Sequence, residues 1–250
     1  MGIGPSGPVP SAIKGLMIAN VLIYIMQISA PRYFFLENFA LVGPYVLRGE
    51  IWRLGSYQFL HGGAWHLGIN MLMLWMFGSE LEQRWGSRFF LKYYFLCGVG
   101  GGLLYTLFMA DAMVPSVGAS GAIYGVLMAY GLWFPNRQVL LWFVVPIPVR
   151  TLVLFLILIE FLQSLQSSGS GIAHAAHLGG MAFGYVYLRW WGQRYGATLG
   201  ALPGLKDIRM AWLRWKFRRL QKRRMGGGEG GGEGGGEGGG SKGRGGRTLH

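Results

Sequence analysis

The chain has 250 residues, of which 52% are hydrophobic and 13% charged, and its formal net charge is +13. This composition argues against an ordinary soluble domain and predicts a polytopic membrane protein, because several nearly uncharged runs approach the ~20 residues that cross a bilayer. The positive charge gathers near the C-terminus, where a membrane surface explains it better than nucleic acid does. Cys97 is the only cysteine, so no intramolecular disulfide can form.

Residues 1–11 are rich in glycine and proline and lack the basic start of a signal peptide, so we expect the first span to stay in the mature protein. The apolar runs predict an all-α domain over residues 12–195, built as a bundle of six transmembrane helices. The connection 29–64 is too polar to span but rich in aromatic residues, and we expect a structured, partly embedded outer loop. The six predicted spans cover residues 12–28, 65–81, 89–109, 120–134, 149–165 and 172–191.

Lysine and arginine in the short loops predict the orientation of the chain. They occur after the second, fourth and sixth predicted spans, whereas the links 110–119 and 166–171 contain neither residue. Both termini should therefore lie in the cytoplasm, and the fourth and sixth spans should begin on the outer side. The expected location is an integral, multi-pass position in a bacterial plasma (inner) membrane.

The candidate nucleophile is Ser120, which stands between Gly118 and Gly121 at the start of the fourth span. A small serine in such a helix is most often a packing residue. However, free backbone amides at a helix start favour negative charge, so this position can also stabilise an oxyanion. Tyr124 follows four residues later, on the same face of the helix.

The candidate base is His177 in the sixth span. At 1.5 Å per residue, Ser120 lies about 21 Å and His177 about 18 Å above the inner ends of their spans, so both reach a similar depth. Gly121 and Gly125 form one pair of small residues, and Gly180 and Gly184 form another. Such pairs allow membrane helices to approach closely, which would bring the serine and the histidine together.

We find no aspartate or glutamate well placed to orient His177, so the predicted unit is a serine–histidine dyad, with Tyr124 stacked against the ring. Glu160 interrupts the fifth span, where a charge is costly. It is read first as a carboxyl group hydrogen-bonded inside the bundle. The polar link 166–171 is a candidate lid over the site.

His66 and Asn70 lie four residues apart near the outer end of the second span. They form either a structural hydrogen-bonding pair or a pair of donors aimed at an oxyanion. His61, in the preceding loop, is assigned a structural role.

Beyond the predicted bundle, residues 205–225 combine basic residues with apolar residues at helical spacing. They predict an amphipathic interfacial helix on anionic lipid, with no nucleic acid expected as a partner. Residues 226–250 form a glycine-rich tail that cannot bury a core and is predicted to be disordered.

Together these motifs resemble the rhomboid intramembrane serine proteases over about residues 10–192. The resemblance is carried, in order along the chain, by Trp52-Arg53, His66-x-x-x-Asn70, Glu82-x-Arg84-x-Gly86, Gly118-x-Ser120-Gly121 with Tyr124, and Ala176-His177-x-x-Gly180-x-x-x-Gly184.

The resemblance implies that Ser120 is the nucleophile and His177 the base. It implies that the oxyanion is received by His66, Asn70 and the backbone amide of Ser120, and that Tyr124 packs on the histidine. It also implies a structural role for Trp52-Arg53 in the first loop and for Glu82 and Arg84 at the cytoplasmic end. Because the resemblance places a mobile fifth span at the substrate entrance, the alternative for Glu160 is a role there.

The sequence therefore predicts a membrane endopeptidase that cleaves peptide bonds in or near the transmembrane segments of other proteins, without a metal or an organic cofactor. Two alternatives come from other classes of protein. One is a rhomboid-like protein that binds membrane clients without cutting them. The other is a proton-coupled transporter or channel that uses the intramembrane residues His66, His177 and Glu160.

Overall fold

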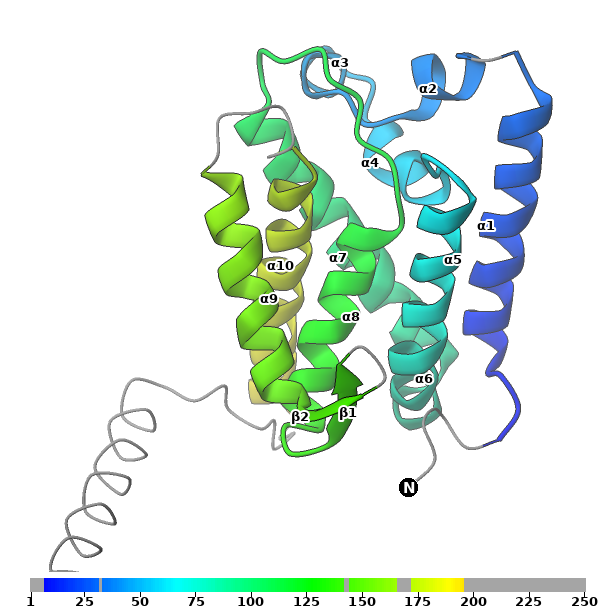
Figure 1. The fold of residues 1–250 in the computed structure, drawn as a ribbon. Coiled ribbons are helices and arrows are strands. Elements are labelled where there is room, and N and C mark those ends of the chain that lie inside the picture. Colours follow the sequence, from blue (N-terminus) through cyan, green and yellow to red (C-terminus); the bar gives the residue numbers. More distant parts are fainter. Residues whose placement is uncertain (1–6, 32, 142–143, 166–171, 196–250) are drawn as a thin grey trace, which may run out of the picture. The chain divides into compact units, whose positions relative to one another are not determined.

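The computed structural model describes residues 7–31, 33–141, 144–165 and 172–195 and is mainly helical (Figure 1). A helix occurs at each of the six predicted spans. The predicted lid 166–171, the basic helix 205–225 and the tail 226–250 lie outside the described residues. The helices at the predicted spans are α1 (Ser11–Ser29), α5 with α6 (Ala64–Met73 and Ser79–Trp85), α7 (Ser87–Phe108), α8 (Ser120–Trp133), α9 (Val149–Ser164) and α10 (Ile172–Tyr195).

By length and composition, α1 is the one helix in the described part of the chain that could cross a membrane. Helices α8 and α9, with 14 and 16 residues, are shorter than a full span. The number of transmembrane crossings therefore stays a prediction.

The helix of the second predicted span runs further than expected. Helix α5 continues through the π-helical segment Leu74–Gly78 into α6, which ends at Trp85 instead of residue 81. The last turn carries charged residues, because charge is less costly at the end of a membrane helix than in its middle. The stop comes at Gly86, whose φ of 78° is a conformation that favours glycine.

The carboxylate of Glu82 joins this helix to the start of α1. It accepts hydrogen bonds from the backbone amides of Ala12 and Ile13, each at 2.8 Å. These amides belong to the first turn of α1 and have no acceptor within that helix. The guanidinium group of Arg84 lies 4.8 Å from the ring centroid of Phe134, at the same end of the bundle.

The connection between α1 and α5 is structured, as predicted. It contains the short helices α2 (Phe34–Phe39), α3 (Gly43–Leu47) and α4 (Arg53–Ser56), which lie together at the top of Figure 1. A 3₁₀ turn, Tyr57–Phe59, follows α4.

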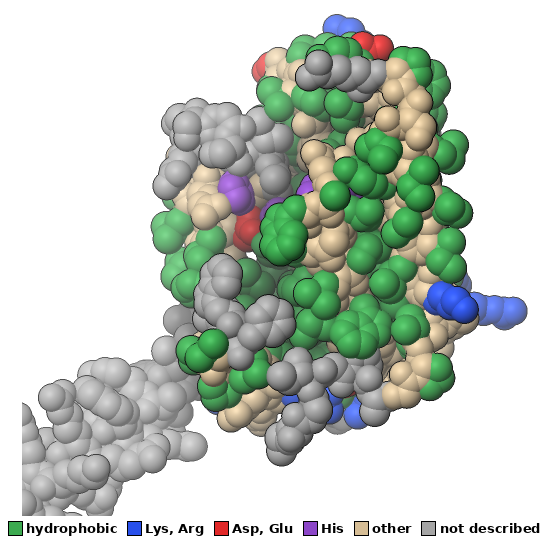
Figure 2. All heavy atoms as spheres, turned by 45° about the vertical axis from the view of Figure 1, so that its right-hand side comes forward, with side chains coloured by type: hydrophobic (Ala, Val, Ile, Leu, Met, Phe, Trp, Pro, Cys, Tyr) green, Lys and Arg blue, Asp and Glu red, His purple; other side chains and the backbone are tan. Residues whose placement is uncertain are grey.

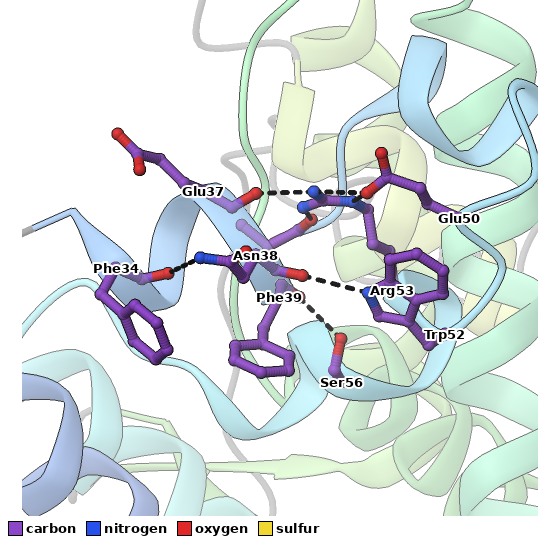
Figure 3. A network of polar contacts seen from close by, with 9 residues as sticks. Phe34, Glu37, Asn38, Phe39, Glu50, Trp52, Arg53 and Ser56 are labelled. Carbon is purple, nitrogen blue, oxygen red and sulfur yellow. Dashed lines mark hydrogen bonds and ion pairs between the residues drawn. The ribbon is translucent and has the colours of Figure 1, made fainter.

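Trp52 and Arg53 connect separate parts of this loop through hydrogen bonds (Figure 3). The indole Nε1 of Trp52 donates to the carbonyl oxygen of Asn38 at 3.1 Å. The buried guanidinium group of Arg53 donates to the carbonyl oxygen of Glu37 at 2.6 Å and forms an ion pair with Glu50. Because several charge-assisted bonds converge on one buried cation, the loop keeps its backbone carbonyls satisfied.

A small antiparallel hairpin joins α8 to α9, where the sequence predicted only a basic link. Strand β1 (Gln138–Leu141) pairs with β2 (Val145–Pro148), with Gln138 opposite Pro148. The hairpin lies at the bottom of Figure 1. Prolines are tolerated here because a two-stranded ribbon consists of edge strands only. This hairpin is an addition to the predicted all-α class.

Helix α10 packs most extensively against α7 and α8. A Cβ atom at Gly180 would lie 1.9 Å from the carbonyl oxygen of Gly121, and one at Gly125 would lie 3.0 Å from the carbonyl oxygen of Gly180. The two helices are thus in backbone contact, as the paired small residues predicted. Gly184 instead faces α7, because a Cβ atom there would meet the hydroxyl oxygen of Tyr93 at 2.4 Å.

Candidate active site

Ser120 and His177 meet between α8 and α10. The Nε2 atom of His177 lies 2.7 Å from the Oγ atom of Ser120, although 57 residues separate them in sequence. The similar depths and the close glycine contact together account for this meeting. The sequence predicted that the two side chains would come within hydrogen-bond distance, and they do.

The segment before α8 places Ser120 inside the bundle. Figure 1 shows an extended stretch that runs down from the top of the molecule to the start of the helix. This stretch is pinned by a backbone bridge between Leu41 and Ser116 and by a bond of 2.9 Å from the amide of Gly118 to the carbonyl oxygen of Tyr57. Gly118 has a φ of 131°, and a Cβ atom there would lie 2.9 Å from the His66 ring. A side chain at this position would therefore be strained and would clash.

The ring of Tyr124 packs against the ring of His177. The two rings are stacked, with centroids 4.2 Å apart and an interplanar angle of 6°. Tyr124 lies one turn after Ser120 on α8, so the same helix supplies the hydroxyl group and the stacking surface. The sequence expectation for Tyr124 matches this geometry.

An acidic side chain does reach His177, and the expectation that none is well placed was wrong. The Oε2 atom of Glu160, on α9, lies 3.1 Å from the Nδ1 atom of His177. The same oxygen lies 2.5 Å from Nδ1 of His174, and the Tyr124 hydroxyl donates to Oε1 of Glu160. The first reading of Glu160, a carboxyl group hydrogen-bonded inside the bundle, is confirmed by these contacts.

The sequence contained a usable signal for Glu160. It lies 10 residues after Arg150, which marks the inner end of its helix. At 1.5 Å per residue this is about 15 Å, close to the depths estimated for Ser120 and His177. Depth alone does not tell which face of α9 is turned inward. Only the packing of α9 against α8 and α10 aims this side chain at the histidines.

A cavity of about 290 Å³ opens beside the serine. Its lining includes Ser120, His177, Tyr124, His66 and Asn70. Figure 2 shows histidine and acidic side chains in a hollow on one side of the molecule. The cavity therefore brings the two predicted donors and the predicted dyad to one place.

Asn70 keeps one donor available for a ligand. Its Nδ2 atom donates to the carbonyl oxygen of His66 at 2.8 Å, within the same helix. The amide nitrogen carries two hydrogens, and the second has no partner among the described residues, so it can bind a group in the cavity. Nδ1 of His66 accepts from the amide of Gly62 at 3.4 Å, and its other edge lies against Gly118. His66 and Asn70 thus make structural hydrogen bonds and also line the cavity.

His61 is buried beside this pair and fits its predicted structural role. Its backbone exchanges two hydrogen bonds with the side-chain amide of Gln27, which ties the loop to α1. The rings of His61 and His66 are 5.1 Å apart, edge to face. Burial, and secondarily the neighbouring His66, lowers the pKa of His61 to about 4, so the ring is neutral at pH 7.

Among the described residues, Glu160, His174 and His177 could also hold a metal ion, because they offer three ligand atoms within 4.8 Å of one another. Two imidazoles and one carboxylate form a donor set that suits zinc. The bonds within the cluster explain the same arrangement without an ion. The prediction of no metal cofactor stays a prediction.

Comparison with known proteins bears on the whole of this site. A protein-family model described as "Rhomboid domain" matches residues 48–194, which is more than half of the chain. The chain belongs to the rhomboid family. The rhomboid region contains all the predicted site residues, from Trp52 and Arg53 through Ser120 to His177 and Gly184, and it also contains Glu160.

Rhomboid relatives come from fungi, plants and bacteria. "Rhomboid protein 1, mitochondrial" of Saccharomyces cerevisiae is 34% identical over 70% of this chain and 51% of its own length. "RHOMBOID-like protein 12, mitochondrial" of Arabidopsis thaliana is 28% identical over 68% of this chain and 55% of its own. "Rhomboid protease GluP" of Bacillus subtilis is 34% identical over 56% of this chain and 26% of its own. The chain thus spans about half the length, or less, of these relatives.

Proposed function

We propose that this chain is an intramembrane serine endopeptidase that cleaves other membrane proteins in or near their transmembrane segments. The observation that carries the proposal is the 2.7 Å contact between Nε2 of His177 and Oγ of Ser120, inside a cavity lined by further polar groups. A serine hydroxyl group is a weak nucleophile until an adjacent base can take its proton, and this contact supplies the base. Membership of a family that includes a named protease supports the same activity.

In the proposed reaction, Oγ of Ser120 attacks the carbonyl carbon of the scissile peptide bond while Nε2 of His177 takes the hydroxyl proton. The negative charge on the carbonyl oxygen would be met by the Ser120 backbone amide, the second Nδ2 hydrogen of Asn70 and the ring of His66. His177 then gives its proton to the leaving amine. A water molecule, activated by the same ring, hydrolyses the resulting ester on Ser120.

The surface of the molecule supports a position in a membrane. Leu22 and Met26 on α1 and Phe155, Leu158 and Phe161 on α9 are all at least half exposed. Figure 2 shows apolar side chains over the side of the molecule and basic ones toward its ends. Lipid would cover such a surface. We propose six crossings with cytoplasmic termini, since the basic loops lie after the second and fourth predicted spans.

The proposed location is a membrane of a bacterium or of an organelle. The bacterial plasma membrane is the location expected from the sequence, and the Bacillus relative supports it. The yeast and Arabidopsis relatives, which are named as mitochondrial, favour an organellar membrane. Contact of residues 205–225 with anionic lipid is part of the proposal and concerns residues outside the described part of the chain.

The test is covalent labelling of the purified protein by a fluorophosphonate, combined with cleavage of a reporter transmembrane substrate. Wild type should be labelled and active, whereas Ser120→Ala should be unlabelled and at least about 10⁴-fold less active, because it removes only the nucleophile. A protein that binds clients without cutting them, or a transporter, would show no labelling of Ser120. Cleavage by purified Ser120→Ala at the wild-type rate would contradict the proposal.

A further inference from the structure

Three side chains from two helices converge on the carboxylate of Glu160. Glu160 lies on α9 and is buried, with a relative exposure of 4%. Its Oε1 atom accepts from the hydroxyl group of Tyr124 on α8, and its Oε2 atom lies 2.5 Å from Nδ1 of His174 and 3.1 Å from Nδ1 of His177, both on α10. A buried carboxylate is costly unless several donors satisfy it, and here they do.

The carboxylate favours one of the two ring nitrogens of His177 as the site of the proton. An ionised carboxylate only accepts hydrogen bonds, so a ring nitrogen that faces it is favoured in the N–H form. With the proton on Nδ1, the lone pair lies on Nε2, which is the atom that faces Ser120. This is the tautomer that a general base needs. Without an acidic neighbour, the neutral ring would divide between two tautomers, one of which cannot accept the serine proton.

The bond from His177 to Glu160 is incompletely formed in the resting site. The distance of 3.1 Å is that of a hydrogen bond, yet Nδ1 of His177 has no aligned hydrogen-bond partner in the described part of the chain. His174 has the shorter bond to the same oxygen. When Ser120 passes its proton to His177, the ring becomes an imidazolium, and its attraction to the buried carboxylate increases. Glu160 therefore stabilises the transition state more than it stabilises the ground state.

We propose that Glu160 is a positioning residue for His177, so that the predicted dyad works as a serine–histidine–glutamate unit. In this unit His174 shares the carboxylate while the site is at rest. The proposal rests on the proposed protease function. Two other readings of the cluster make different predictions: Glu160 as a brace that only holds α9 in place, and Glu160 with the two histidines as a metal site.

The decisive variant is Glu160→Gln, which keeps the size of the side chain and removes the charge. We expect kcat on the reporter substrate to fall about 10- to 100-fold with little change in KM, and fluorophosphonate labelling to slow by a similar factor. The effect should be smaller than the ~10⁴-fold loss seen for a fully aligned acid, because this contact is poorly aligned at rest. Glu160→Asp restores the charge and should recover at least about threefold of the lost kcat.

The matched control is Val153→Ala, which loosens the packing of α9 without touching the carboxylate. Val153 is fully buried, and its Cγ2 atom lies 2.8 Å from the Cβ position of Gly131 on α8. This variant should lower the Tm but keep kcat within about threefold, because the cavity it leaves affects stability. If Val153→Ala lost kcat as strongly as Glu160→Gln did, with an equal fall in Tm, Glu160 would be only a brace.

Further outcomes separate this proposal from the protease function itself. Wild-type kcat in Glu160→Gln, beside an inactive Ser120→Ala, would overturn the role of Glu160 and leave the protease intact. Activity in Ser120→Ala would overturn the protease function first. A wild-type kcat that changes after dialysis against EDTA and returns with added zinc would make the three side chains metal ligands and overturn the positioning role.

Discussion

At the scale of single residues, the site has two histidines on one face of α10, and only one of them touches the serine. His177 presents Nε2 to Ser120 at 2.7 Å and stacks on Tyr124. His174 lies one turn earlier, with its ring 6.2 Å from that of His177 and its Nδ1 atom on Glu160. These contact distances agree with His177 as the base, which is the residue that the sequence predicted.

We therefore predict that His177→Ala abolishes both cleavage and fluorophosphonate labelling, whereas His174→Ala keeps most of each. Loss of the base should cost several powers of ten, because the serine keeps its proton. Kinetics of the two folded variants on one reporter substrate provide the measurement. An inactive His174→Ala beside an active His177→Ala would reverse the assignment.

Asn70 is the second residue whose role can be measured. Asn70→Ala should lower kcat about a hundredfold, or roughly 3 kcal/mol, because one oxyanion donor acts mainly on the transition state. Labelling of Ser120 should persist at least in part. Turnover equal to wild type would leave Asn70 only its bond to the carbonyl oxygen of His66.

At the scale of elements, the contact between α8 and α10 holds the nucleophile and the base together. Each helix supplies one of the two side chains, and the helices touch through Gly121 and Gly180. The meeting of Ser120 and His177 thus depends on a backbone contact that lies next to Ser120 on α8 and one turn after His177 on α10. A shift of about 1 Å between the helices would break the 2.7 Å contact, so the packing is part of the chemistry.

Gly180→Ala should accordingly destabilise the bundle and lower activity. The new Cβ atom would lie 1.9 Å from the Gly121 carbonyl oxygen, so the helices must separate at a cost of about 1–3 kcal/mol. Thermal unfolding in detergent, followed by labelling of Ser120, measures both effects. The control is Gly15→Ala on α1, where a Cβ atom meets nothing within 4 Å. An unchanged Tm in Gly180→Ala would show that the two helices accommodate a methyl group at this contact without loss of stability.

At the scale of the whole molecule, the loop between α1 and α5 makes stability depend on pH. His61 is buried in the loop, and its pKa is lowered to about 4, whereas in the unfolded chain it is near 6.5. Between these values the unfolded chain binds a proton that the folded chain does not. Stability is therefore lost as the pH falls from about 6.5 to about 4.

We predict that His61→Phe, which keeps a ring of similar shape, flattens this loss. Wild type should show a Tm that falls over this pH range, and the variant should show a smaller fall, because one titrating group has been removed. Thermal unfolding at several pH values between 4 and 7 provides the comparison. The same pH slope in both proteins would assign the acid sensitivity to other groups.

The sequence by itself determined where the helices lie and which family motifs they carry. Apolar runs are local, so their lengths predicted α1, α7, α8 and α10 to within a few residues. Rise per residue gave Ser120 and His177 similar depths. The pairs of small residues predicted close helix contact, and Gly121 and Gly180 form it. Spacing on one helix likewise placed Tyr124 next to Ser120.

Only the tertiary structure decided which side chain faces which across helices that are distant in sequence. The rotation of α9 about its axis is set by its packing on α8 and α10, and no local pattern encodes it. The sequence therefore predicted Glu160 only as a carboxyl group hydrogen-bonded inside the bundle, and that packing is what places it 3.1 Å from His177. The hairpin before α9 was missed for a related reason: its two short strands are stable through pairing with each other, which is a contact between segments and not a property of either one.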